Sequence, residues 1–215
     1  MINRSHRPRA ATTLKLCSLF LQYPDAEIVA ARKDLSAEVA RLSRSPAAAT
    51  LARFCAWWTD EDPLALEQHY VETFDLDRRC GLYVTFYTDG DKRQRGAALL
   101  RLKRLYRAAG LPLADGELPD FLPAMLEFAM AAPDGQGAIV LREHRPALEL
   151  LRTSLHDRST PYAHVLDAVC LALGKTTGAA RTTARQLAAA GPPFELVGLQ
   201  PFGASSETPT TEATW

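Results

Sequence analysis

The sequence lacks the short motifs that mark common enzymes, metal sites and membrane spans. Its four cysteines include no CxxC pair, its five histidines form no HExxH motif, and no GxSxG nucleophile motif occurs. No run of about 18 apolar residues is present, so no segment is predicted to cross a membrane. We therefore expect reduced, buried thiols, no metal site and a cytoplasmic protein.

An excess of charge of one sign is also absent. The 25 Lys and Arg residues balance the 25 Asp and Glu residues, which argues against a dedicated nucleic-acid-binding domain because such domains are strongly basic. Aromatic residues make up only 8%, whereas alanine runs recur at 47–49 and 188–190. Alanine favours helices and is depleted in strands, so a helix-rich globule is predicted.

Apolar residues recur at helical spacing along most of the chain, for example at Ile28, Ala31, Leu35, Val39 and Leu42. This pattern predicts an all-α, single-domain bundle of about 8–10 helices over residues 13–190. Residues 1–12 are expected to be flexible, and the extension 191–215 to be largely disordered. The segment 81–88 has the composition of a strand, but no partner strand is evident, so tertiary context is expected to override its propensity.

Charges of opposite sign are separated in the middle of the chain. Seven acids and no Lys or Arg lie between Asp60 and Asp77, and seven Lys or Arg residues and no acids lie between Lys92 and Arg107. One interpretation is that the two helices face each other or water. The alternative is a bipolar recognition surface, with one side for a basic peptide and the other for phosphates or an acidic partner. The basic helix 92–107 also leaves open a helical nucleic-acid-binding regulator.

An ordered set of short segments spans about residues 14–175. It comprises Leu21–Asp25 (LQYPD), Tyr70–Asp75 (YVETFD), Leu82–Tyr83, Gly90–Gly96 (GDKRQRG), Tyr106–Leu111 (YRAAGL), Glu117–Pro123 (ELPDFLP), Leu126–Phe128 and Tyr162–Ala163. This set resembles the NarJ-type nitrate reductase assembly chaperones, within the wider TorD-like class. The resemblance departs at Phe121, because the wider class usually carries His after the Pro-Asp pair.

The resemblance implies an all-α chaperone with no catalysis of its own and no stably bound cofactor. Such a protein binds the N-terminal segment of the apo catalytic (alpha) subunit of respiratory nitrate reductase. It assists molybdenum cofactor insertion in the cytoplasm before the subunit attaches to the membrane. The resemblance implies no nucleic-acid partner, and it leaves open whether the protein is a monomer or a dimer.

The residues suggest how a client peptide would bind. We expect a groove lined by Tyr70, Phe74, Leu82 and Tyr83 to take the apolar face of a peptide helix. Neighbouring acids, Glu72 and Asp75, would read basic residues of that peptide, and Arg93 and Arg95 would pair with carboxylates or cofactor phosphates. Glu117 and Asp120 complete the candidate site, although Asp120 is also a plausible N-cap for the helix that follows it.

Overall fold

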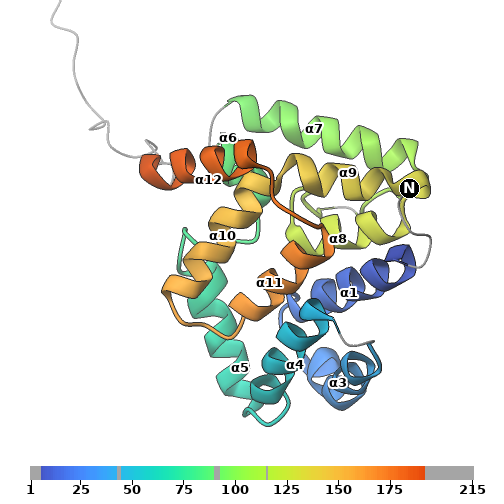
Figure 1. Cartoon of the computed structure of the whole chain (residues 1–215), viewed down its shortest axis with the longest axis vertical. Helices are drawn as coiled ribbons and strands as arrows, with labels where there is room; N and C mark the ends of the chain where they lie inside the picture. The colour runs from blue at the N-terminus through green and yellow to red at the C-terminus, as the bar shows by residue number, and fades with distance from the viewer. Residues whose placement is uncertain (1–5, 43–44, 90–92, 115, 192–215) are drawn as a thin grey trace, which may run out of the picture.

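The computed structural model is all-α, as predicted (Figure 1). It describes residues 6–42, 45–89, 93–114 and 116–191, and within them no strand occurs. The twelve α-helices of this part are α1 (His6–Phe20), α2 (Ala26–Ala30), α3 (Arg32–Arg41), α4 (Pro46–Trp58), α5 (Pro63–Tyr70), α6 (Val84–Asp89), α7 (Arg93–Ala108), α8 (Leu122–Ala131), α9 (Gln136–Glu143), α10 (Arg145–Asp157), α11 (Ala163–Ala172) and α12 (Gly178–Ala190). A π-helix, Val71–Asp75, and a 3₁₀-helix, Pro133–Gly135, complete them.

The structure has more helices than the sequence pattern predicts, in part because the backbone breaks an apolar stripe that is continuous in the sequence. The stripe through Ile28 and Val39 is divided at Ala31, whose ψ of −2° ends α2 before α3 begins. The helical stretch from 138 to 155, which the sequence predicts to be interrupted at Pro146, is divided two residues earlier, at His144. Pro146 lies in the first turn of α10, where the missing amide proton costs no helical hydrogen bond.

The first and last described helices can be compared with the predicted boundaries at residues 12 and 191. Helix α1 begins at His6, so the part of the expected flexible segment 1–12 that the structure describes is helical. Helix α12 ends at Ala190, followed by Gly191 with a φ of +73°. The expected disordered extension lies, from residue 192 onward, outside the described residues. Among the described helices, none is long and apolar enough to cross a membrane.

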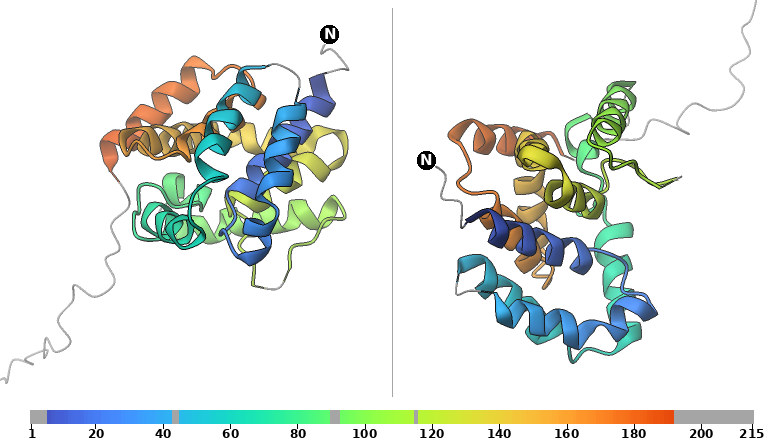
Figure 2. Two further views of the ribbon diagram at one scale, coloured as in Figure 1. Left: turned by 90° about the horizontal axis from the view of Figure 1, so that it is seen from below. Right: turned by 90° about the vertical axis from the view of Figure 1, so that its right-hand side faces the viewer.

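The core is centred on α11, which packs against both α1 and α4. In the right-hand view of Figure 2, α1 runs between the α3–α4 pair and α8. Four side chains of α11 are completely buried: Val165, Leu166, Ala168 and Val169. Because burying one Val or Leu side chain stabilises a fold by about 1.5–3 kcal/mol, this helix makes a large contribution to the free energy of folding.

A cluster of aromatic rings surrounds Tyr162, which precedes α11. Phe54 and Trp57 of α4 contact it, and so do Tyr70 and Phe74 from α5 and the π-helix, with ring centroids between 4.8 and 6.1 Å away. Aromatic pairs at these distances stabilise a core beyond the area they bury. The cluster therefore anchors the acidic segment 60–77 to the body of the bundle.

Candidate functional site

The carboxylate of Asp120 lies at the centre of a buried polar network. It has no solvent exposure, and its Oδ2 accepts hydrogen bonds from Thr85 Oγ1 at 2.6 Å and from an Arg95 guanidinium nitrogen at 3.3 Å. Its Oδ1 is buried without a hydrogen-bond partner among the described residues. Arg95 is the member that reaches the surface, since 21% of its side chain is exposed. The network thus ties α7 to α6 and to the turn before α8.

Two short backbone segments meet at this network. The amide of Val84 donates to the carbonyl of Asp120 at 2.9 Å, and the amide of Leu122 donates to the carbonyl of Leu82 at 2.8 Å. These bonds form a single antiparallel bridge between Tyr83 and Phe121. The segment 81–88 therefore contributes one bridge and then becomes α6, as expected for a strand-like stretch without a partner strand.

The proposed capping role of Asp120 is wrong. Helix α8 begins at Leu122, its N-cap residue is Phe121, and no side chain caps it. The carboxylate of Asp120 accepts from Thr85 and Arg95 instead. Phe121 takes the place of the histidine usual in the resembled class. Its ring packs on Tyr83, with centroids 5.6 Å apart.

The expected groove of four apolar side chains is not formed, because three of the four belong to the core. Tyr70, Phe74 and Leu82 are 5%, 5% and 3% exposed. The hydroxyl of Tyr70 donates to the carbonyl of Leu21 at 3.1 Å, which holds its ring inside the aromatic cluster. Only Tyr83 is open to solvent, with 42% of it exposed.

An open surface of mixed character lies beside these buried rings. Tyr23 is 42% exposed, and its ring packs edge-on against Tyr70 at 5.5 Å. Partial desolvation, followed by the negative charges of Glu67, Asp75 and Asp25, raises the pKa of the Tyr23 phenol. We call the surface made by Tyr23, Asp25, Glu67 and Asp75 the acidic face. It combines an exposed aromatic ring with three carboxylates, a combination that suits a basic, partly apolar peptide.

Glu72 lies on a different side of the π-helix from Asp75. It is close to His69, whose pKa is lowered by burial and partly restored by the charges of Glu72 and Glu61. His69 also forms a 2.7 Å hydrogen bond with Thr160 and stacks on Tyr162. Glu72 and Asp75, which we expected to bind basic residues of the peptide together, therefore have different surroundings.

The remaining predicted residues are Glu117 and Arg93. Glu117 is half-buried on the rim of a small cleft of about 270 Å³, together with Lys15, Tyr106 and Leu113. Arg93 begins α7, but its side chain lies outside the described residues. Helices α5 and α7 lie at opposite ends of the molecule (Figure 1), so the acidic and basic helices do not face each other.

Sequence reasoning missed three residues of these sites. Thr85 is a lone hydroxyl in an aromatic segment, and only its proximity to Asp120 reveals its role. Tyr23 belongs to the LQYPD segment that carries the family resemblance, but nothing in that segment marks it as a binding residue. Glu67 precedes Asp75 by eight residues, about two helical turns, so the two acids lie on similar sides of the helical segment.

Comparison with known proteins matches residues 40–168 to the family described as nitrate reductase delta subunit. The chain belongs to the nitrate reductase delta subunit family. The matched range contains the Asp120 network and the π-helix. It excludes Tyr23 and the whole of α12, so these two features lie outside the part that defines the family.

Individual relatives of the delta subunit family agree with this assignment. The chain is 34% identical to a probable nitrate reductase molybdenum cofactor assembly chaperone, NarJ, of Bacillus subtilis, covering 75% of this chain and 88% of that protein. It is 33% identical to the Escherichia coli K12 chaperone NarJ, covering 72% and 66%. The nitrate reductase-like protein NarX of Mycobacterium tuberculosis is 37% identical over 71% of this chain, which spans only 23% of NarX.

A solved structure supports the fold of this family. A putative redox enzyme maturation protein from Archaeoglobus fulgidus superposes with a TM-score of 0.57 at 25% identity. The superposition covers 77% of this chain and 94% of that protein. The helical bundle is therefore shared with a solved protein over most of its length.

Proposed function

We propose that this protein is an assembly chaperone for nitrate reductase. It binds the apo catalytic subunit through that subunit's N-terminal segment and holds it competent for molybdenum cofactor insertion before membrane attachment. The observation that carries the proposal is the match to Bacillus subtilis NarJ, because it extends over 88% of a protein named for this role. In this proposal the cofactor is cargo for the client rather than a resident group, and the chaperone performs no catalysis.

The acidic face is the proposed docking surface for the client segment. Its carboxylates would attract basic residues of the segment, while the exposed ring of Tyr23 would cover an apolar side chain. The Asp120 network holds a further exposed ring in place, because its backbone bridge positions Tyr83. Binding of one client conformation would stabilise that conformation by mass action, which is how a chaperone without catalysis acts.

Charge reversal within the π-helix tests the docking surface. We expect Asp75→Lys to weaken binding of a peptide from the client's N-terminus by about tenfold, because an attraction is replaced by a repulsion. Glu72→Lys is the matched control, since Glu72 is equally exposed and only three residues away but lies toward His69. Isothermal titration calorimetry measures both affinities. Equal affinities for the two variants would remove the acidic face from the proposal.

A second experiment tests the function itself rather than the surface. The full-length chaperone is co-purified with the apo catalytic subunit. The experiment is done once with the intact subunit and once with a subunit that lacks its N-terminal residues. We expect a stable complex with the intact subunit and its loss on truncation. Failure to isolate the complex with the intact subunit would contradict the proposed function, and a complex unaffected by truncation would contradict the proposed segment.

A further inference from the structure

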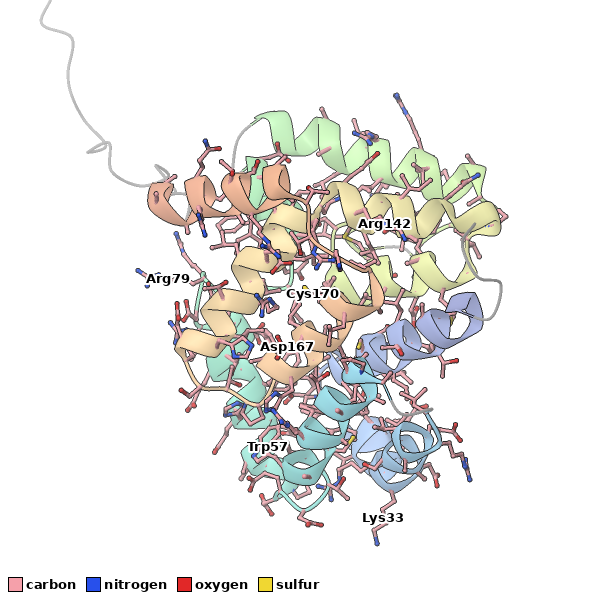
Figure 3. The ribbon with its side chains drawn as sticks, viewed as in Figure 1. Lys33, Trp57, Arg79, Arg142, Asp167 and Cys170 are labelled. Carbon is pink, nitrogen blue, oxygen red and sulfur yellow. The ribbon has the colours of Figure 1, made fainter. Side chains whose placement is uncertain are left out.

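A cleft of about 820 Å³ lies between α10, α11 and α12, and it shares no residue with the acidic face or the Asp120 network. Asp167 and Cys170 of α11 line it, and Figure 3 shows both beside α10. We call this site the basic cleft. Its charged side chains are Arg145, Glu149, Arg152, Asp167, Lys175, Arg181 and Arg185, and its apolar ones include Leu150, Leu171 and Ala188.

The two acids of the basic cleft are fully engaged by neighbours. Glu149 accepts from Arg145 at 2.9 Å, from Arg152 at 3.0 Å and from the hydroxyl of Thr176. Burial raises the pKa of Glu149, but these hydrogen bonds outweigh it and leave the pKa below its ordinary value. Asp167 accepts from Arg152 at 3.1 Å and pairs with His156 at 3.0 Å. In this part of the cleft the acids are therefore already paired within the protein.

The other three cations of the basic cleft have no such partners. Lys175, Arg181 and Arg185 form no ion pair with any described residue. Five cations against two acids leave the cleft with a surplus of three positive charges. Because like charges on facing walls repel, a bound anion would remove an unfavourable interaction as well as form favourable ones.

These three cations converge because of how α12 is placed. Arg181 and Arg185 are four residues apart, so they lie on one face of α12, and Lys175 lies in the connection that enters this helix. The opposite wall offers Leu150 and the 47% exposed Leu171. Helix α12 packs on α10, and its half-buried residues Ala180, Ala184 and Leu187 recur at helical spacing, which sets Arg181 and Arg185 beside the cleft.

We propose that the basic cleft binds a small diphosphate ester, with its phosphates on Lys175, Arg181 and Arg185 and its organic part on the wall of Leu150 and Leu171. Guanidinium groups match phosphate oxygens in bidentate geometry, and a lysine adds a point charge. The surplus of three charges is comparable to the charge of a diphosphate at neutral pH. The volume lies within the range of small-molecule sites, roughly 300–1,000 Å³. The proposal goes beyond the client-binding function and does not depend on it.

Calorimetry on the full-length protein tests this site, with inorganic pyrophosphate and ADP as the probes. We expect saturable one-to-one binding that weakens at least about tenfold in Arg181→Gln/Arg185→Gln. The matched control is Arg104→Gln/Arg107→Gln on α7, which removes two equally exposed arginines outside the cleft and is expected to leave binding unchanged. Circular dichroism verifies that both double variants remain folded.

Each alternative outcome bears on a separate part of the proposal. No saturable binding of either probe, or equal losses in the α12 and α7 variants, would overturn the site, because general surface charge would then explain the attraction. ADP binding that is tighter than pyrophosphate binding and weakened by Leu171→Ser would support the apolar wall. ADP binding no tighter than pyrophosphate binding would overturn the assignment of an organic part.

Discussion

Gly137 lies where α8 and α9 cross so closely that a single methyl group decides whether the two helices fit. It is buried in the first turn of α9. A Cβ atom placed there would lie 2.5 Å from the carbonyl oxygen of Phe128, 2.7 Å from the amide nitrogen of Ala129, and closer still to the Cα of Ala129. All three atoms belong to the backbone of α8, so no side-chain rotation relieves the contact. We expect Gly137→Ala to force the two helices apart.

The expected magnitude follows from two opposing effects. Alanine is favoured over glycine in a helix interior by about 1 kcal/mol, which by itself would stabilise the variant. Overpacking a core typically costs about 1–3 kcal/mol, and a backbone neighbour places this site at the upper end of that range. The net loss in free energy of unfolding is therefore about 2 kcal/mol. For a chain of this size that loss corresponds to a decrease in Tm of roughly 4–8 °C.

Thermal unfolding followed by circular dichroism measures this change, and the chain supplies its own control. Gly96 lies inside α7, and a Cβ there would meet no atom within 4 Å. Gly96→Ala is therefore expected to stabilise the protein by about 0.5–1 kcal/mol, through helix propensity alone. If Gly137→Ala also raised Tm, the close crossing of α8 and α9 would be refuted.

Three further predictions concern buried or half-buried polar groups. Asp120→Asn is expected to lower the free energy of unfolding by about 1–3 kcal/mol in urea titrations, because two hydrogen bonds lose a charged acceptor. A double-mutant cycle with Thr85→Val should give a coupling above about 0.5 kcal/mol, and additivity would contradict the network. The pKa of Glu149 is lowered from its ordinary 4.5, so its stabilising contribution is complete above 4.5 and is lost as the pH falls through the native value. The urea midpoint should consequently fall more steeply below pH 4.5 in the wild type than in Glu149→Gln; parallel curves would count against this. The pKa of His69 is lowered from 6.5 by burial, so an NMR titration should give a pKa below 6.5. Because the unfolded state then binds the proton more tightly, lowering the pH below 6.5 should favour unfolding. A measured pKa of 6.5 or higher would contradict the burial of His69.

Local signals in the sequence were sufficient for most of the helical architecture. The Asp62-Pro63 pair begins α5, with the Asp62 side chain accepting hydrogen bonds from two amides of the first turn and the proline at the first helical position. Gly110 and Gly174 follow α7 and α11 with φ values of +76° and +85°, as expected of residues that end helices. These features depend on neighbours a few residues away, so the sequence contains all the information they require.

The candidate site was predicted only in part. The ordered motifs led to the correct family, and the structure brings two of the candidate residues, Asp120 and Arg95, into one ion pair that the sequence did not predict. The burial of Tyr70, Phe74 and Leu82 was not predicted, because an apolar residue on a helix stripe looks the same whether it lines a groove or a core. The separation of Glu72 from Asp75 was also missed, since it depends on how Phe74 of the π-helix packs against Tyr70 and Tyr162.

By itself, then, the sequence determined an all-α chain, the approximate positions of its helices and its family, because helix propensity, capping and apolar spacing act over a few residues. The tertiary structure alone decided that the strand-like segment 81–88 forms one bridge and then a helix, and that Thr85 meets Asp120. It also decided that Arg145 meets Thr176 across 31 residues of chain. Such contacts depend on the angles and distances at which whole helices pack, and no local pattern specifies these.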